Sequence, residues 1–419
     1  MSRNLISGNS LPLRKYCDIL SGFLIAGGAV FYLGSSFLGL IPLASGAALY
    51  LFIIFYFEGR EKGAGAVKKH MSRLAVPVIG IVSAVFFGAI IMLLTGYDPV
   101  RSYAALFYGG FVKNWYVSVL NATPLIFTGL SIAFAFKAGL FNIGAEGQYY
   151  IGAMAGAWLG LTLDLSPLLS IMLIYIGGSF IASLWNFIPA LLKVKTGAHE
   201  VITTMMFAHI ARYLSPIFIR AFGGDPATSS HAYVTYEIPQ SNWLLSFRAF
   251  IPDANYRLHT GILIAVATAF FVNYMLNNSK TGFEIRAVGF NRDAARVQGI
   301  SIGKNIFIAM MAAGALAGMA GITQVLGLDH KLFENLQAGY GWNGISVALL
   351  ASNHPIGVIF TSLLWGALDA GGQYMARTTN TPNSIVEIIK GIMLFLIVAK
   401  YIYIYAVKFI KKKRRGGNA

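Results

Sequence analysis

The chain has 419 residues, of which 56% are hydrophobic and only 11% charged. Together with a mean hydropathy of +0.65, this composition excludes a soluble globular protein of this length. The single cysteine, Cys17, excludes an intramolecular disulfide. The formal net charge of +16 needs an explanation other than a basic soluble domain.

Apolar runs long enough for one membrane crossing recur along nearly the whole chain. They predict an all-α fold, a polytopic helical membrane protein with about 10–12 transmembrane helices. The run at 343–353 is too short to cross a bilayer unaided, which predicts a broken or re-entrant segment. The expected helices cover residues 18–35, 39–57, 74–95, 118–136, 144–163, 168–190, 200–219, 260–277, 304–327, 343–353, 356–375 and 384–405.

The basic residues indicate how these helices are oriented. With both termini cytoplasmic, 22 of the 32 Lys and Arg residues fall in cytoplasmic segments and seven fall outside. This asymmetry follows the positive-inside rule, so the net charge marks topology and predicts no nucleic-acid partner.

Three regions are expected along the chain. Residues 1–73 form an N-terminal extension with two transmembrane helices and a basic cytoplasmic loop. Residues 74–405 form the main transmembrane domain. Residues 406–419 form a basic cytoplasmic tail, in which 411–415 would bind anionic membrane lipids.

The sequence predicts no enzyme. No phosphate-binding loop is present, because the nearest imitation, 299–305, has the wrong spacing and lacks the hydroxyl. His199 begins a zinc-protease-like pattern, but Thr203 replaces the second ligand, so no metal site is predicted. No arrangement of Ser, His, Asp or Cys indicates nucleophilic catalysis.

Polar residues within the apolar segments are costly in hydrocarbon and therefore informative. Asn142 and Glu146 are four residues apart in a glycine-containing stretch, 140–148, which favours an unwound entry to the next helix. This stretch either borders a solute pathway or caps the helix at the cytoplasmic side. Glu200 and Thr203 belong to a partly polar helical stripe with the same two alternatives.

A second glycine-aromatic cluster, 339–344, contains Trp342 and Asn343 and resembles 140–148 in character. Two such clusters indicate structural repeats that meet at a central path. Separately, the charged stretch 282–296 interrupts the apolar sequence and has helical character. It is either a solvated loop or a helix that docks a soluble partner.

Several of these motifs together resemble a known family, the permease subunits of bacterial ABC importers in the branched-chain amino acid/ribose permease superfamily. The nearest group within it is the nucleoside/simple-sugar group, which works with basic-membrane-protein-type lipoproteins. The resemblance covers about residues 77–401, and residues 142–148 are its most specific part. The motifs that carry it lie at 124–130, 138–148, 199–206, 281–289 and 339–350.

The resemblance implies that 74–405 is an ABC permease domain with an ATPase-coupling segment at about 281–301. It also implies three protein partners: an ABC ATPase subunit, a second homologous permease that forms a heterodimer, and an extracytoplasmic substrate-binding lipoprotein. ATP and Mg would be bound by the ATPase, and this chain would bind no cofactor directly. The location implied is the bacterial cytoplasmic (inner) membrane, crossed many times.

The resemblance also assigns roles to particular residues. The ATPase-coupling residues would be Glu284, Arg286, Gly289, Asn291, Arg292 and Arg296. The residues along the translocation path would be Asn142, Glu146, Gln148, Glu200, Thr203, Trp342 and Asn343.

The expected function is ATP-driven uptake of a small-molecule solute, a nucleoside. Riboflavin or a simple sugar is the first alternative, because the residues 207–209 depart from the family pattern and leave the solute open. A second alternative is a secondary transporter driven by an ion gradient, for which Glu146, Glu200, Asp369 and Glu387 are candidates. A scaffold or receptor without transport is a third.

Overall fold

The structure is a computed structural model that describes residues 80–222, 234–247, 257–334, 336 and 339–399. The predicted N-terminal extension, 1–73, and the basic tail, 406–419, lie outside the described residues. Within the described ranges the chain is helical, and the only β-type pairs are two isolated bridges, Val234 with Phe333 and Ser246 with His259. The predicted all-α fold is confirmed.

The chain divides into two compact units, residues 1–94 with 388–419, and residues 95–387. In the first unit, the helix Gly80–Leu94 lies against the second half of α16 (Ser384–Val398). A Cβ added at Gly80 would be 2.7 Å from the side chain of Ile397, so the absence of a side chain allows this contact.

The second unit holds all the motifs of interest. Its helices, in chain order, are α4 (Pro99–Tyr108), η1 (Gly109–Lys113), α5 (Trp115–Lys137), α6 (Ala145–Thr162), α7 (Pro167–Trp185), α8 (Phe187–Thr196), α9 (Glu200–Phe222), η2 (Gln240–Asn242), α10 (Gly261–Asn278), α11 (Lys280–Phe290), α12 (Arg292–Val297), α13 (Ile302–Gln324), η4 (Val325–Asp329), α14 (Tyr340–Leu350), α15 (Pro355–Thr379) and the start of α16.

Six helices of the described ranges are long and apolar enough to cross a membrane, which confirms a polytopic membrane protein. Two of them are composite, because α8 continues α7 and η4 continues α13. The six are Trp115–Lys137, Pro167–Thr196, Glu200–Ala221, Gly261–Asn278, Ile302–Asp329 and Pro355–Thr379.

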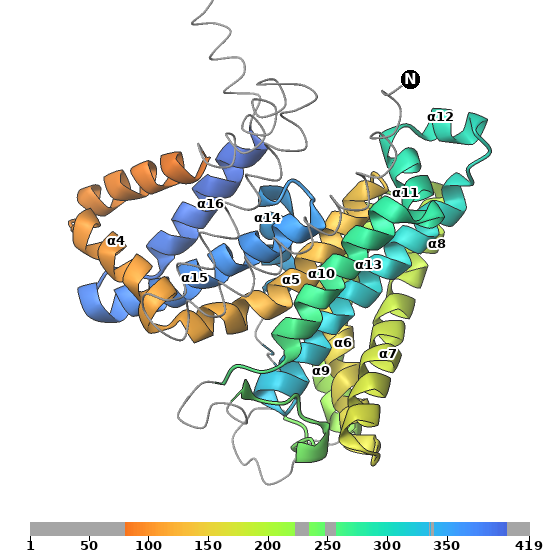
Figure 1. Cartoon of the computed structure of the whole chain (residues 1–419), viewed down its shortest axis with the longest axis horizontal. Coiled ribbons are helices and arrows are strands. Elements are labelled where there is room, and N and C mark those ends of the chain that lie inside the picture. Colours follow the sequence, from red (N-terminus) through yellow and green to blue (C-terminus); the bar gives the residue numbers. More distant parts are fainter. Residues whose placement is uncertain (1–79, 223–233, 248–256, 335, 337–338, 400–419) are drawn as a thin grey trace, which may run out of the picture. The chain divides into compact units, whose positions relative to one another are not determined.

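Helices α5 and α13 form the centre of this unit. Helix α13 packs against α5, α6 and α7, and α5 also packs against α14 and α15 (Figure 1). The contact between α6 and α13 is backbone to backbone, because a Cβ at Gly152 would overlap the carbonyl of Gly318. The small-residue spacing along α6 therefore serves close helix packing, as lipid offers little hydrophobic force for association.

The observed helices depart from the expected ones at two places. The helix expected over 168–190 ends at Trp185, and α8 begins after Asn186, whose Nδ2 donates to the carbonyl of Met310 at 2.6 Å. Helix α4 was not expected. Its start is fixed by Asp98, whose carboxylate accepts from the amides of Val100 and Arg101.

Helices α10 and α13 connect the two ends of the unit. Helix α10 has 18 residues and is about 27 Å long. At one of its ends lie 244–247 and His259, and at the other it leads into α11 and α12, which extend beyond the bundle (Figure 1). Helix α13 returns from α12, so the predicted charged stretch is the connection between two membrane-length helices.

Candidate functional site

The carboxylate of Glu146 holds the start of α14. One carboxylate oxygen accepts the amide of Gly339 and the other accepts the amide of Gly341, both at 2.6 Å. The residue lies in the first turn of α6 and is 5% exposed. A Cβ at Gly341 would overlap the backbone nitrogen of Glu146, so glycine is required for this approach. A negative charge here also interacts favourably with the dipole of α14.

Helix α14 starts inside the bundle. The hydroxyl of Thr128 donates to the carbonyl of Tyr340 at 3.0 Å, and Thr128 lies nine positions before Lys137, the last residue of α5. That is about 14 Å along the α5 axis. At the other end, His354 follows α14, and burial and the charge of Lys137 lower its pKa.

With 11 residues, α14 is about 16 Å long, roughly half of a 30 Å hydrocarbon core. The broken segment predicted at 343–353 is therefore confirmed, with bounds shifted to Tyr340–Leu350. The backbone amides at the start of α14 have no partners within the helix, and the carboxylate of Glu146 accepts two hydrogen bonds there. Non-helical backbone within a membrane requires such protein partners.

Asn142 and Gln148 form a reciprocal amide pair at the entry to α6. The Asn142 Nδ2 donates to the Gln148 oxygen at 2.9 Å, and the Gln148 Nε2 donates back at 3.1 Å. Each side chain is 1% exposed. The predicted unwound entry is confirmed, because α6 begins only at Ala145.

The same amide pair reaches two other helices. Asn142 donates to the hydroxyl of Ser131 on α5 at 3.3 Å, and that hydroxyl donates to the carbonyl of Ala313 on α13 at 2.7 Å. The glycine-amide stretch thus joins α5, α6 and α13 through buried hydrogen bonds. Breaking any of them would leave a buried polar group without a partner, so the network resists rearrangement.

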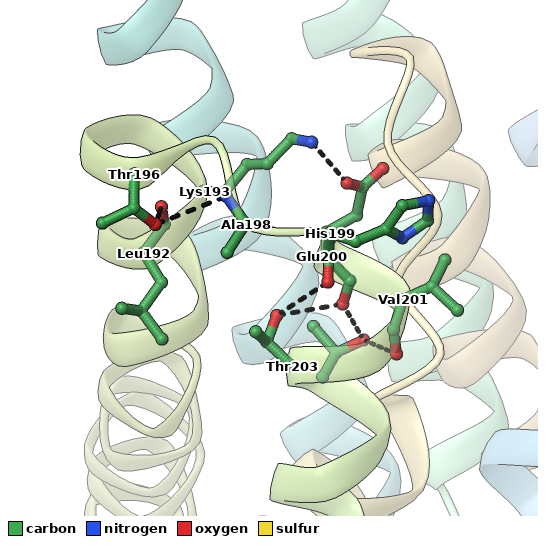
Figure 2. A network of polar contacts seen from close by, with 9 residues as sticks. Leu192, Lys193, Thr196, Ala198, His199, Glu200, Val201 and Thr203 are labelled. Atoms are coloured by element: carbon green, nitrogen blue, oxygen red, sulfur yellow. Dashed lines mark hydrogen bonds and ion pairs between the residues drawn. The ribbon is translucent and has the colours of Figure 1, made fainter.

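Glu200 lies in the first turn of α9 and is paired with Lys193 of α8 (Figure 2). The Lys193 Nζ is 2.7 Å from a Glu200 oxygen, and both side chains are nearly buried. The Thr203 hydroxyl donates to the carbonyl of Glu200 at 3.2 Å. These contacts fix the short connection between α8 and α9.

Helices α9 and α14 also present exposed polar and aromatic groups. Trp342 is 37% exposed, and its ring lies 6.4 Å from that of His209, also exposed. Asn343 is half-buried beside it. Arg212 is exposed near the middle of α9, where a charge facing hydrocarbon costs about 2.5–3.5 kcal/mol.

The sequence prediction named Trp342 and Asn343 but did not assign His209 or Arg212 a role. A signal was available for Arg212, because it is the single charged residue between positions 201 and 219.

The charged stretch folds as two short helices with well-defined starts. The Ser279 hydroxyl accepts the amide of Gly282 and caps α11. The Asn291 oxygen accepts the amides of Asp293 and Ala294, both at 3.0 Å, and caps α12. The predicted coupling residue Asn291 therefore sets the angle between the two helices.

Two other predicted coupling residues attach α11 to the bundle. Glu284 accepts a hydrogen bond at 3.2 Å from Asn305 of α13. Gly289 lies directly on the turn after α5, where a Cβ would overlap the carbonyl of Lys137. Gly139 in that turn has a φ of +71°, a conformation that favours glycine.

The outer surface of α11 and α12 is basic and apolar. The predicted coupling residues Arg286, Arg292 and Arg296 are exposed. Three exposed apolar residues that the sequence prediction did not single out accompany them. These are Phe283 (60% exposed), Phe290 (95%) and Val297 (86%), spaced seven residues apart. Among the described residues, no group of His, Cys, Asp and Glu is placed to hold a metal ion.

Comparison with known proteins identifies the family. Residues 115–398 match the family described as "Branched-chain amino acid transport system / permease component". The chain belongs to this family of permeases. The resemblance drawn from the motifs is confirmed, and the matched region includes Glu146, the α11–α12 segment and α14.

Three relatives illustrate the range of the permease family. The Guanosine ABC transporter permease protein NupP of Bacillus subtilis is 37% identical over 84% of this chain and 99% of that protein. The Nucleoside ABC transporter permease protein NupB of Lactococcus lactis is 34% identical over 79% of this chain and 92% of that protein. The Glucose ABC transporter permease protein TsgB13 of Haloferax volcanii is 30% identical over 82% and 92%. No solved structure matches the chain.

Proposed function

We propose that this permease is the membrane subunit of an ATP-driven importer that takes up nucleosides. The observation that carries this proposal is the 37% identity to a guanosine permease over 99% of that protein's length, with a nucleoside permease at 34%. The membrane-length helices and the absence of a phosphate-binding loop in the sequence agree with a subunit that depends on a separate ATPase.

In this proposal α11 and α12 dock on that ATPase, which binds the ATP and Mg²⁺. Exposed apolar side chains flanked by arginines are typical of a protein interface. Phe290 would enter a pocket of the partner, with Arg292 and Arg296 around it. Gly289 and Glu284 would transmit the partner's motion, because they join α11 to α5 and α13.

The translocation path would border the start of α14. Glu146 holds that start, Asn142 and Gln148 hold the entry to α6, and Glu200 with Thr203 holds the start of α9. These groups act as positioning residues, since their polar atoms are occupied by protein partners. The exposed Trp342 and its neighbour Asn343 are the groups left to meet the solute.

The transporter would include further partners. Bacillus subtilis has two relatives named as guanosine transporter permeases, NupP at 37% and NupQ at 24% identity. This supports pairing of our chain with a second, homologous permease in a heterodimer. An extracytoplasmic binding lipoprotein would deliver the solute at the end opposite α11 and α12. The chain would cross the bacterial inner membrane with both termini in the cytoplasm.

A simple sugar is the second candidate solute, because a glucose permease is 30% identical over 92% of its length. The choice is tested by deleting the gene and complementing it with the wild-type chain or an empty vector. Uptake of labelled guanosine, adenosine and glucose is then measured in the same cells. We expect the wild-type chain to restore nucleoside uptake only. Restored glucose uptake alone, or no change in any, would contradict the proposal.

The energy source is tested in the same cells. Collapsing the ion gradient while ATP is maintained should leave nucleoside uptake intact, and depleting ATP should stop it. The reverse pattern would favour a gradient-driven transporter.

A further inference from the structure

An arginine lies in the middle of a membrane-length helix, on an exposed face. Arg212 is twelve positions after Glu200, about 18 Å along α9. Within the described ranges its side chain forms no salt bridge and no hydrogen bond. A guanidinium is strongly disfavoured against lipid tails, so this face of α9 borders water or another polar surface.

The charge of Arg212 acts on groups near the start of α14. Glu146 and the Tyr150 hydroxyl both lie close enough to interact with it electrostatically. The carboxylate of Glu146 is already occupied by the amides of Gly339 and Gly341. The N–H donors of the Arg212 guanidinium therefore stay available for a further acceptor. The nearby negative charge of Glu146 lowers the free-energy cost of placing the positive charge of Arg212 in the middle of α9.

Two exposed aromatic rings, one on the same helix as Arg212 and one on α14, lie close to each other. His209 is one helical turn before Arg212 on α9, and Trp342 lies in the first turn of α14. Their rings are 6.4 Å apart and inclined by 40°, and both residues are exposed. An exposed indole together with a donor-only cation on the neighbouring helix is suited to a flat heterocycle that carries hydrogen-bond acceptors on its edge.

We propose that Trp342, His209 and Arg212 form the subsite that recognises the base of the solute, and that this base is a 6-oxopurine such as guanine or hypoxanthine. The inference rests on the proposed uptake of nucleosides and specifies which nucleosides are preferred. The base stacks on Trp342, and the guanidinium of Arg212 donates to O6 and N7 together. His209 closes the site from the α9 side.

This arrangement discriminates between purines. Guanine and hypoxanthine present two adjacent acceptors, O6 and N7, which match the fork of a guanidinium. Adenine presents an amino donor in place of O6, and arginine has no acceptor to receive it. A simple sugar offers no planar ring for Trp342. The subsite therefore favours guanosine and inosine over adenosine.

The test measures KM for guanosine and adenosine in cells that carry the whole transporter with variants of this chain. Arg212→Lys keeps the charge but loses the paired geometry, and Arg212→Ala loses both. We expect the guanosine KM to rise at least about fivefold in Arg212→Lys and further in Arg212→Ala. The adenosine KM should change much less. Trp342→Leu should raise both, because stacking does not depend on the base.

Two exposed residues provide matched controls. Arg377→Ala removes an exposed arginine from the end of α15, and Tyr213→Leu removes the exposed ring next to Arg212. Both should leave the KM values unchanged. Should Arg212→Ala not reach the membrane, Arg212→Lys and Trp342→Leu decide the question, since the first keeps a long cationic side chain and the second keeps an apolar one.

The outcomes separate this inference from the proposed function. Wild-type cells that take up no nucleoside would overturn both. Wild-type nucleoside uptake with an unchanged guanosine-to-adenosine preference in Arg212→Lys would overturn the subsite alone. An equal loss for both nucleosides in the Arg212 variants, with the wild-type preference retained, would identify Arg212 as a contact to the second permease instead.

Discussion

The start of α14 and the α11–α12 segment are both polar interruptions of an apolar chain, but they are built in opposite ways. At the α14 start, the carboxylate of Glu146 is 5% exposed and both oxygens are bonded to backbone amides. On α11 and α12, Phe290 is 95% exposed, and three exposed arginines lie on the same two helices. The first region is complete within the chain, whereas the second presents an uncovered surface.

The difference separates positioning from docking. A buried polar group whose partners are all protein fixes a shape, and its loss is felt as lost stability. An exposed apolar side chain contributes little to the stability of its own chain. It contributes to binding free energy when another protein covers it. Variants in the two regions should therefore fail in different assays.

The largest effect is expected from Glu146→Ala. Two amides at the start of α14 would lose a charged acceptor, at a cost of about 3–5 kcal/mol. The chain should melt at a clearly lower temperature in detergent and transport nothing, while Glu146→Gln, which keeps one acceptor oxygen, should lose less. Glu237→Gln is the matched control, because Glu237 is about half exposed beside Lys331. A Glu146→Ala chain of wild-type stability would contradict the positioning role.

A smaller effect is expected where α11 meets α5. Gly289→Ala inserts a Cβ into the carbonyl of Lys137 and should displace α11, at a cost of about 1–3 kcal/mol. ATP-driven uptake should fall while ATP hydrolysis by the complex continues. Gly391→Ala is the control, since among the described residues a Cβ there would meet no atom within 4 Å beyond its chain neighbours and the backbone of its own helix. Full uptake by the Gly289→Ala transporter would show that the close contact between α11 and the turn after α5 is not needed for coupling.

Phe290→Ala should leave the chain itself intact. Its unfolding temperature should stay at the wild-type value, because the side chain makes almost no contact. Binding of the ATPase should weaken about fivefold or more, as expected for a lost aromatic anchor. Phe180→Ala, at a 61% exposed position on α7, should change neither quantity. Equal ATPase binding by both variants would remove Phe290 from the interface.

A further effect concerns the dependence of stability on pH. Burial, and then the neighbouring His330, lowers the pKa of His259 to about 4. The unfolded chain therefore binds a proton between pH 6.5 and 4 that the folded chain excludes, so stability falls as the pH drops through this window. At pH 5 the loss is about 2 kcal/mol relative to pH 7.

His259→Gln should flatten this part of the pH profile, measured as the melting temperature in detergent between pH 5 and pH 7. An unchanged slope in the variant would assign the acid sensitivity to other groups.

The broken helix and the unwound entry to α6 were predictable because they depend on local features. The apolar run of α14 is too short to cross a bilayer, and a glycine-containing segment precedes it. The glycines near Asn142 favour irregular backbone, and α6 accordingly begins only at Ala145. The partner of Glu146 was not predictable, because Gly339 and Gly341 are 193 and 195 positions away along the chain.

The exposed apolar residues of α11 and α12 were missed because an apolar residue can face lipid or the core as well as a protein partner. Phe290 and Val297 are apolar, and apolar residues in a membrane protein ordinarily face lipid or the core. Only their positions on α11 and α12 show them to be exposed at the end of the bundle. Helix α4 was missed because it is short and its start depends on the cap made by Asp98.

The most direct test of the account is a cysteine cross-link from α12 to the ATPase in native membranes. The single native cysteine is removed as Cys17→Ser, and Asp293→Cys places a new thiol on the exposed face of α12. We expect a short bifunctional reagent to join this chain to the ATPase, and a Phe180→Cys control on α7 to give no such product. Absence of the α12 product in membranes that retain ATP-driven uptake would contradict the coupling role of this segment.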